Sequence, residues 1–200
     1  MRKTRLILLL AACLFLAGCS QPVPAKAADG AAWSEEWVSV GNVVGVDTPE
    51  GLTPRENNTA LDSKGMYYAT WSMGEETAYV NADGGDAKVY GAQFYLLLAG
   101  YDAPAKAESA LAEWQSMAAS QYAVEETSEA VYNGQPFTVI TYTYRSETNP
   151  YQRGASAFGI YRNYAVNVEL SCLEDFGGDA RTLLADFLEH CHYAVYSQHT

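Results

Sequence analysis

Four strand-like runs joined in pairs by tight turns constrain the fold of this chain more than any other feature. The run at residues 124–132 meets the run at residues 136–145 at Asn133-Gly134, and residues 155–161 meet residues 164–172 at Arg162-Asn163. Asn-Gly is a strong hairpin signal because both residues tolerate a positive φ, and Asn163 suits a left-handed turn position as well. The sequence therefore predicts an antiparallel meander of consecutive strands.

One helix is predicted before this meander in the sequence and one after it. Apolar residues recur at helical spacing over residues 104–122, after the start signal Asp102-Ala103-Pro104. A second helix begins after Asp179 and presents one apolar face made by Leu183, Leu184, Phe187, Leu188 and Cys191.

Aromatic and β-branched runs at residues 38–46, 65–73 and 87–98 add strands in the first half of the chain. The expected fold is α+β: an antiparallel sheet of about six strands, with the long central helix and the C-terminal helix packed on it.

Two cysteines of the predicted domain are expected to point into the core. Val166, Val168, Leu170 and Cys172 alternate with polar residues along one strand, so Cys172 faces the buried side. Cys191 lies on the apolar face of the last helix. The pair can form a disulfide or remain as two buried thiols, and the sequence leaves both alternatives open.

The N-terminus has the features of an export signal. Arg2, Lys3 and Arg5 precede eleven apolar residues at 6–16, a run too short for a bilayer that requires about 20 residues. Ala17-Gly18-Cys19 then resembles the lipobox of bacterial lipoproteins. The resemblance implies cleavage before Cys19 and attachment of a diacylglyceryl group to its sulfur.

These features divide the chain into three parts. Residues 1–18 form the signal peptide, residues 19–32 the lipidated cysteine and a flexible tether rich in small and polar residues, and residues 33–200 a single domain. The expected location is the extracytoplasmic face of the cell membrane. The net charge of −12 disfavours nucleic acids and anionic headgroups, so the lipid is the expected membrane anchor.

No pattern of side chains indicates catalysis. In Glu189-His190-Cys191-His192 the two histidines are two residues apart and diverge on a helix, which disfavours a shared metal ion. The chain has no Gly-x-Ser-x-Gly sequence, and Cys172 lies within a strand. We therefore expect no enzyme activity, no metal site and no cofactor.

Tyrosines are the most unusual side chains of the meander. The chain has 15 of them, and Tyr142, Tyr144 and Tyr161 are candidates for contact with a partner because tyrosine combines a large ring with a hydroxyl group. The alternative is ordinary strand propensity, since tyrosine favours half-buried sheet positions.

The order of elements over residues 38–196 resembles the PsbP-like fold. The resemblance depends on the helix at residues 104–122, on Asn133-Gly134 with Pro136-Phe137, and on the terminal helix at residues 180–192. The same segments are similar to small uncharacterised lipoproteins of gut Clostridia. The resemblance implies a binding or assembly role without a catalytic centre.

The expected function is that of a non-catalytic lipoprotein that binds another envelope protein. Two alternatives are capture of a small ligand, such as a sugar or a peptide, and an unrecognised hydrolase. A flat surface patch would favour a protein partner, a deep aromatic pocket would favour a small ligand, and an acid paired with histidine in a cleft would favour a hydrolase.

Overall fold

A computed structural model describes residue 34 and residues 36–58, 65–81 and 84–194. The signal peptide, the tether and Cys19 lie outside the described residues. The main sheet has seven strands in which every neighbouring pair is antiparallel. Their spatial order is β3 (Thr53–Asn58), β4 (Met66–Met73), β7 (Ala92–Gly100), β11 (Tyr164–Cys172), β10 (Arg153–Tyr161), β9 (Gln135–Tyr144) and β8 (Tyr122–Tyr132).

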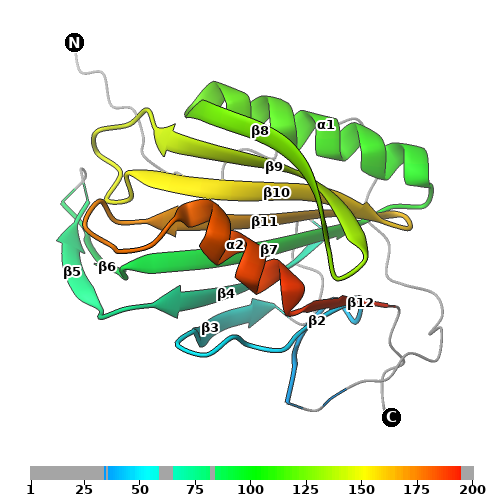
Figure 1. Cartoon of the computed structure of the whole chain (residues 1–200), viewed down its shortest axis with the longest axis horizontal. Coiled ribbons are helices and arrows are strands. Elements are labelled where there is room, and N and C mark those ends of the chain that lie inside the picture. Colours follow the sequence, from blue (N-terminus) through cyan, green and yellow to red (C-terminus); the bar gives the residue numbers. More distant parts are fainter. Residues whose placement is uncertain (1–33, 35, 59–64, 82–83, 195–200) are drawn as a thin grey trace.

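The two helices cover opposite faces of this sheet. Helix α1 (Pro104–Gln121) contacts β8, β10 and β11, whereas α2 (Ala180–Glu189) crosses the face that is nearer to the viewer in Figure 1. The residues of β11 divide accordingly, because Val166 and Val168 belong to the core beneath α2 while Ala165 belongs to the core beneath α1. All nine residues of β11 are consequently buried.

The core beneath α2 is built around one phenylalanine. Phe187 is fully buried, stacks on Phe94 with a centroid distance of 4.8 Å and meets Trp71 edge-on at 4.9 Å. A small three-stranded sheet closes this core near the end of α2 (Figure 1); its strands are β1 (Val38–Val40), β2 (Val44–Val46) and β12 (Cys191–Tyr193).

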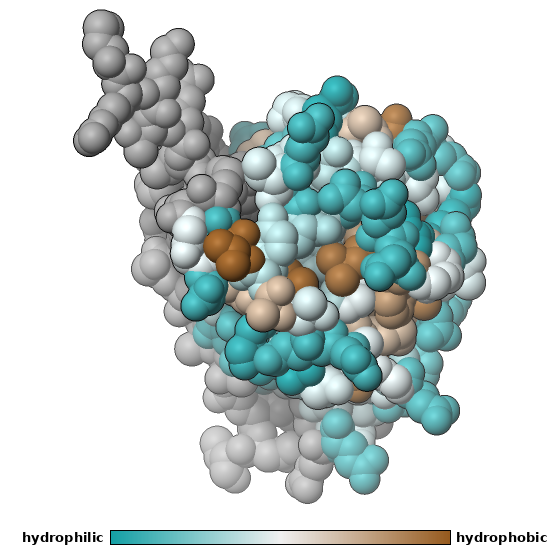
Figure 2. Space-filling model, turned by 90° about the vertical axis from the view of Figure 1, so that its left-hand side faces the viewer, coloured by the Kyte–Doolittle hydropathy of each residue, from teal (hydrophilic) through white to brown (hydrophobic). Residues whose placement is uncertain are grey.

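A two-stranded ribbon of β5 (Thr77–Val80) and β6 (Asp86–Val89) projects at one end of the molecule. Tyr79 donates a hydrogen bond to the Thr148 carbonyl at 2.9 Å, and Lys88 pairs with Glu76 at 2.8 Å. Figure 2 shows that this end is mostly hydrophilic, with small separate hydrophobic areas. It presents no broad apolar patch to the viewer.

The predicted hairpins are confirmed. Asn133 and Gly134 both have positive φ, at 44° and 79°, between β8 and β9. In the second hairpin the positive φ of 56° falls on Arg162, which corrects the expectation for Asn163. Asn163 instead pairs with Tyr101, because its backbone carbonyl accepts the Tyr101 N–H and its side-chain amide donates to the Tyr101 carbonyl.

Three other expectations need correction. The main sheet has seven strands rather than about six. The long helix is not central, because α1 lies over the half of the sheet that contains β8, β10 and β11. The last helix ends at Glu189, so Cys191 belongs to β12 and pairs with Val46. The backbone bond from Asp47 N–H to the His190 carbonyl begins this pairing, which ends the helix earlier than its apolar pattern suggests.

Candidate functional site

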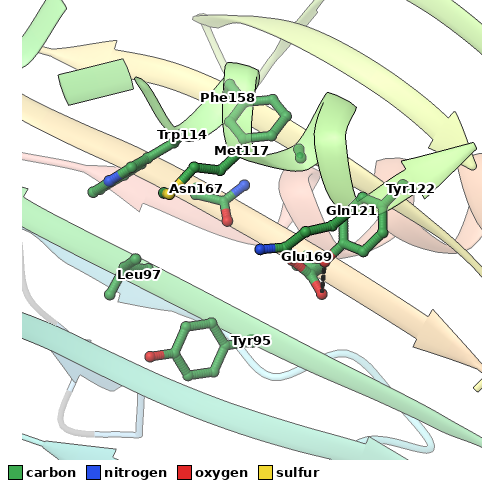
Figure 3. A pocket seen from close by; sticks show the side chains of 10 residues that line it. Tyr95, Leu97, Trp114, Met117, Gln121, Tyr122, Phe158, Asn167 and Glu169 are labelled. Carbon is green, nitrogen blue, oxygen red and sulfur yellow. Dashed lines mark hydrogen bonds between the residues drawn. The ribbon is translucent and has the colours of Figure 1, made fainter. Parts of the chain in front are cut away.

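A pocket of about 100 Å³ lies between α1 and the sheet face beneath it. Its helix side is lined by Trp114, Met117, Ala118 and Gln121. Its sheet side is lined by Tyr95 and Leu97 of β7, Tyr122 of β8, Phe158 of β10, and Asn167 and Glu169 of β11. Figure 3 shows the Trp114 and Met117 side chains directed from the helix toward the strands. Four of the ten lining side chains are therefore aromatic, and the polar side chains of Asn167 and Glu169 lie on the sheet side, which forms the floor of the pocket.

The alternation of β11 explains why polar groups lie there. Positions that face α2 carry apolar side chains, and positions that face α1 carry Asn167, Glu169 and Ser171. The sequence pattern predicted only one buried face for this strand. Because α1 covers the second face as well, Asn167 and Glu169 are each only 8% exposed.

Glu169 is the central polar group of the site. The hydroxyls of Tyr122 and Tyr144 both donate to its Oε1 atom, at 3.1 and 3.3 Å. Burial raises the pKa of the carboxyl group above its ordinary value, while hydrogen bonds from the tyrosines act in the lowering direction. Glu169 is thus a desolvated acid that the two phenol hydroxyls hold in place.

Three tyrosine rings hold this acid in position. Tyr122 and Tyr142 are stacked with a centroid distance of 3.9 Å, and Tyr144 meets both rings edge-on. The Tyr144 hydroxyl also lies 2.6 Å from Ser171 Oγ. Burial is the largest cause that raises the pKa of all three phenols. They therefore remain neutral hydrogen-bond donors at ordinary pH, which suits positioning rather than proton transfer.

Asn167 adds a second polar group to the floor of the pocket. Its Nδ2 atom donates to Ser156 Oγ at 2.8 Å and to the Ala157 carbonyl at 3.2 Å. Both amide protons are used by these bonds, so the Oδ1 atom is the acceptor that remains.

The three tyrosines proposed as partner contacts have different positions. Tyr142 is 1% exposed and lies inside the cluster around Glu169, which corrects the expectation that its ring contacts a partner. Tyr144 is partly buried in the same cluster. Tyr161 packs against Tyr193 at 5.9 Å on the side of the sheet that faces α2. The structure does not bring the three rings together on one surface.

The other candidate groups lie away from the pocket. Cys172 and Cys191 are buried free thiols. Cys172 lies opposite Arg153 in the register of β10 and β11, near the start of α2, whereas Cys191 follows the end of that helix. Burial raises their pKa values to about 11 and about 12. His192 stacks on Trp37 at 4.1 Å. The described residues contain no group of three His, Cys, Asp or Glu side chains that could hold a metal ion.

Sequence reasoning missed Asn167, Glu169 and the helix residues of the pocket. One signal was present: three polar residues alternate within a strand whose other positions are strongly apolar. That pattern is typical of a strand with one solvated face. Only the position of α1 distinguishes a buried polar floor from such a surface.

Comparisons with known proteins give no family for this chain. No family model matches it, and no curated protein matches it. Among solved structures, the solution structure of cyanobacterial PsbP (CyanoP) from Synechocystis sp. PCC 6803 is similar with a TM-score of 0.46 and 9% identity, and the match covers 82% of this chain and 98% of that one.

A crystal structure from Bacteroides thetaiotaomicron VPI-5482 is similar with a TM-score of 0.33 and 11% identity. This match covers 78% of this chain and 47% of that one. The described part of the chain also contains no helix whose length and apolar character would let it cross a membrane.

The raised pKa of Glu169 should make the stability of the fold depend on pH. Because the pKa of Glu169 is raised in the folded state, its favourable contribution is fully present below the pKa of the unfolded chain and is lost as pH rises through the folded pKa. Glu169→Gln removes this loss. We expect the Gln variant to gain stability relative to wild type from about pH 4 upward, by about 1.4 kcal/mol for each unit of pKa difference.

Urea unfolding at a series of pH values measures this gain. Glu125→Gln removes a carboxylate at an exposed position of β8 and is the matched control. A Glu169→Gln difference that does not change between pH 4 and pH 8 would contradict the assignment of a raised pKa.

Proposed function

We propose that this chain is a non-catalytic binding protein that captures a small organic ligand in the pocket beneath α1. The observation that carries the proposal is the pocket itself: about 100 Å³, lined by aromatic side chains, with Glu169 and Asn167 on its floor. Ligand sites typically combine a mostly apolar lining with a few polar groups that orient the ligand. A cavity of this size suits a single ring or a short branched chain.

The alternatives have less support. A protein partner would require a flat surface patch, and Tyr142, one of its three candidate contacts, is buried. A hydrolase would require an acid paired with a base in a cleft, and no histidine lines this pocket. The groups that contact Glu169 are phenols whose pKa is raised by burial, which makes them poor proton carriers near neutral pH. Binding without chemistry is the function that these groups favour.

The proposed location follows from the N-terminal sequence. We propose that Cys19 carries a diacylglyceryl group and holds the domain at the extracytoplasmic face of the cell membrane. A binding domain on a tether at that surface would meet ligands that arrive from outside the cell.

A fragment screen with a pocket-filling variant tests the proposed function. Ala118 lines the pocket and is 7% exposed, whereas its neighbour Ala119 is exposed on the outer side of α1. We expect ring-sized fragments to raise the melting temperature of wild type and of Ala119→Leu. Ala118→Leu should lose this response, because the added side chain occupies the cavity.

The full chain should be screened by thermal shift, and binders confirmed by calorimetry. We expect affinity to fall at least about tenfold in Ala118→Leu relative to Ala119→Leu. A screen without any binder, or binders that are insensitive to Ala118→Leu, would remove the support for this function.

A further inference from the structure

We infer that the pocket selects a compact organic cation, a protonated amine with a small apolar body, and that Glu169 is its counter-ion. This inference rests on the proposed function and adds the chemical class of the ligand. It depends on three features of the pocket: its charge, its hydrogen-bonding groups and its rings.

The charge of the lining is one-sided. Glu169 is the only carboxylic acid among the ten lining residues, and none of the ten is Lys, Arg or His. An anionic ligand would therefore enter a desolvated site beside a like charge without a cation to offset it. A cation would gain a partner for a buried carboxylate, and the net charge of −12 of the chain attracts cations over long range.

The polar floor presents acceptors rather than donors. The hydroxyls of Tyr122 and Tyr144 are directed at Glu169 Oε1, and the amide protons of Asn167 are directed at Ser156 and Ala157. A carboxylate has about four lone-pair sites, so Glu169 can accept further hydrogen bonds from a ligand, and Asn167 Oδ1 can accept one as well. Because Asn167 and Glu169 are two residues apart on β11, they project from the same face about 7 Å apart. An ammonium group carries three donors and can bridge two such oxygens.

Four aromatic rings of the pocket also favour an organic cation. Trp114 and Phe158 lie at one end of the pocket, and Tyr95 and Tyr122 lie nearer to the carboxylate (Figure 3). Aromatic faces attract organic cations and also accept an apolar ligand body. A carboxylate surrounded by aromatic rings thus matches an amine with a ring or a short alkyl chain better than it matches a sugar.

The alternative ligand is a neutral molecule. It would accept a hydrogen bond from the Glu169 carboxyl group when that group is protonated. The pH dependence of binding separates the two. The ionisable groups that face Glu169 are Tyr122 from β8, Tyr142 and Tyr144 from β9, and Tyr95 from β7 across the pocket; α1 contributes the uncharged Gln121. Because burial also raises the pKa of these phenols, Glu169 ionises at lower pH than Tyr122, Tyr142 and Tyr144. Affinity for an amine must rise as the pH rises and Glu169 ionises, whereas affinity for a neutral acceptor must fall.

Three probes of nearly equal shape test the inference: benzylammonium, benzyl alcohol and benzoate. Calorimetry with the full chain at pH 7 should give benzylammonium an affinity at least about tenfold higher than that of benzyl alcohol, and benzoate the lowest affinity. Glu169→Gln should bring the ratio of benzylammonium to benzyl alcohol close to one. Ala118→Leu should weaken binding of all probes, while Ala119→Leu should match wild type.

Each result decides one point. Benzylammonium that binds no tighter than benzyl alcohol, or a preference that survives in Glu169→Gln, overturns the inferred ligand class. Affinity for benzylammonium that falls from pH 5 to pH 8 overturns it as well. The proposed function fails separately, and only if the fragment screen finds no binder that depends on Ala118.

Discussion

Gly154→Ala should lower the free energy of unfolding by about 3 kcal/mol. This loss is large, because the total free energy of unfolding of a native domain is only about 5–15 kcal/mol. Gly154 lies in β10 between Tyr142 of β9 and Ser171 of β11. A Cβ atom at this position would collide with the Leu170 carbonyl and would lie 2.8 Å from the Tyr142 hydroxyl. The carbonyl belongs to the backbone of the neighbouring strand, so it cannot move without disturbing the sheet.

The loss should extend to the binding site. The Tyr142 ring lies across Gly154 and stacks on Tyr122, which in turn donates to Glu169. An added methyl group displaces Tyr142 and so disturbs the whole tyrosine cluster. Urea unfolding measures the stability, and probe binding under native conditions measures the effect on the pocket.

Gly177→Ala is the matched control for this substitution. A Cβ atom at Gly177 meets no atom within 4 Å, and its φ is not positive. We expect its stability to remain within about 0.5 to 1 kcal/mol of wild type. Similar stabilities for Gly154→Ala and Gly177→Ala would contradict the predicted collision of the added methyl group with Leu170 and Tyr142.

The sequence predicted the second half of the fold well because its signals are local. Asn133-Gly134 favours a particular turn, and the spacing of apolar residues in α1 reflects the geometry of a helix, so neither depends on distant contacts. The first half was predicted less well. Residues 38–46 were predicted as one strand-like run, whereas Gly41 and Asn42 adopt positive φ and divide it into β1 and β2.

The site could not be predicted because it is created by tertiary packing. The residues Trp114, Tyr122 and Glu169 come from three elements, and no periodicity in the sequence links them. The pattern of α1 showed that Trp114 is buried but not which strands lie beneath it. Cys191 illustrates the same limit, since pairing with Val46 overrides its place in the helical pattern.

Cys19→Ala should transfer the protein from the membrane fraction to the soluble fraction. Each methylene buried in a bilayer contributes about 0.8 kcal/mol, so the two acyl chains of a diacylglyceryl group provide stable attachment that the polypeptide would have to replace. A chain with a net charge of −12 is also repelled by anionic headgroups. Loss of the single sulfur at position 19 should therefore release more than about nine-tenths of the protein, as measured by fractionation and immunoblotting.

Cys13→Ala is the control, because Cys13 lies within the apolar run of the leader and would leave with it. This variant should remain in the membrane fraction like wild type. The mass of the membrane-bound form distinguishes lipidation from a retained leader, since lipidation predicts an N-terminus at Cys19 with an added diacylglyceryl group. A Cys19→Ala protein that is processed but still sediments with membranes would refute the lipid anchor and would indicate attachment through the folded domain.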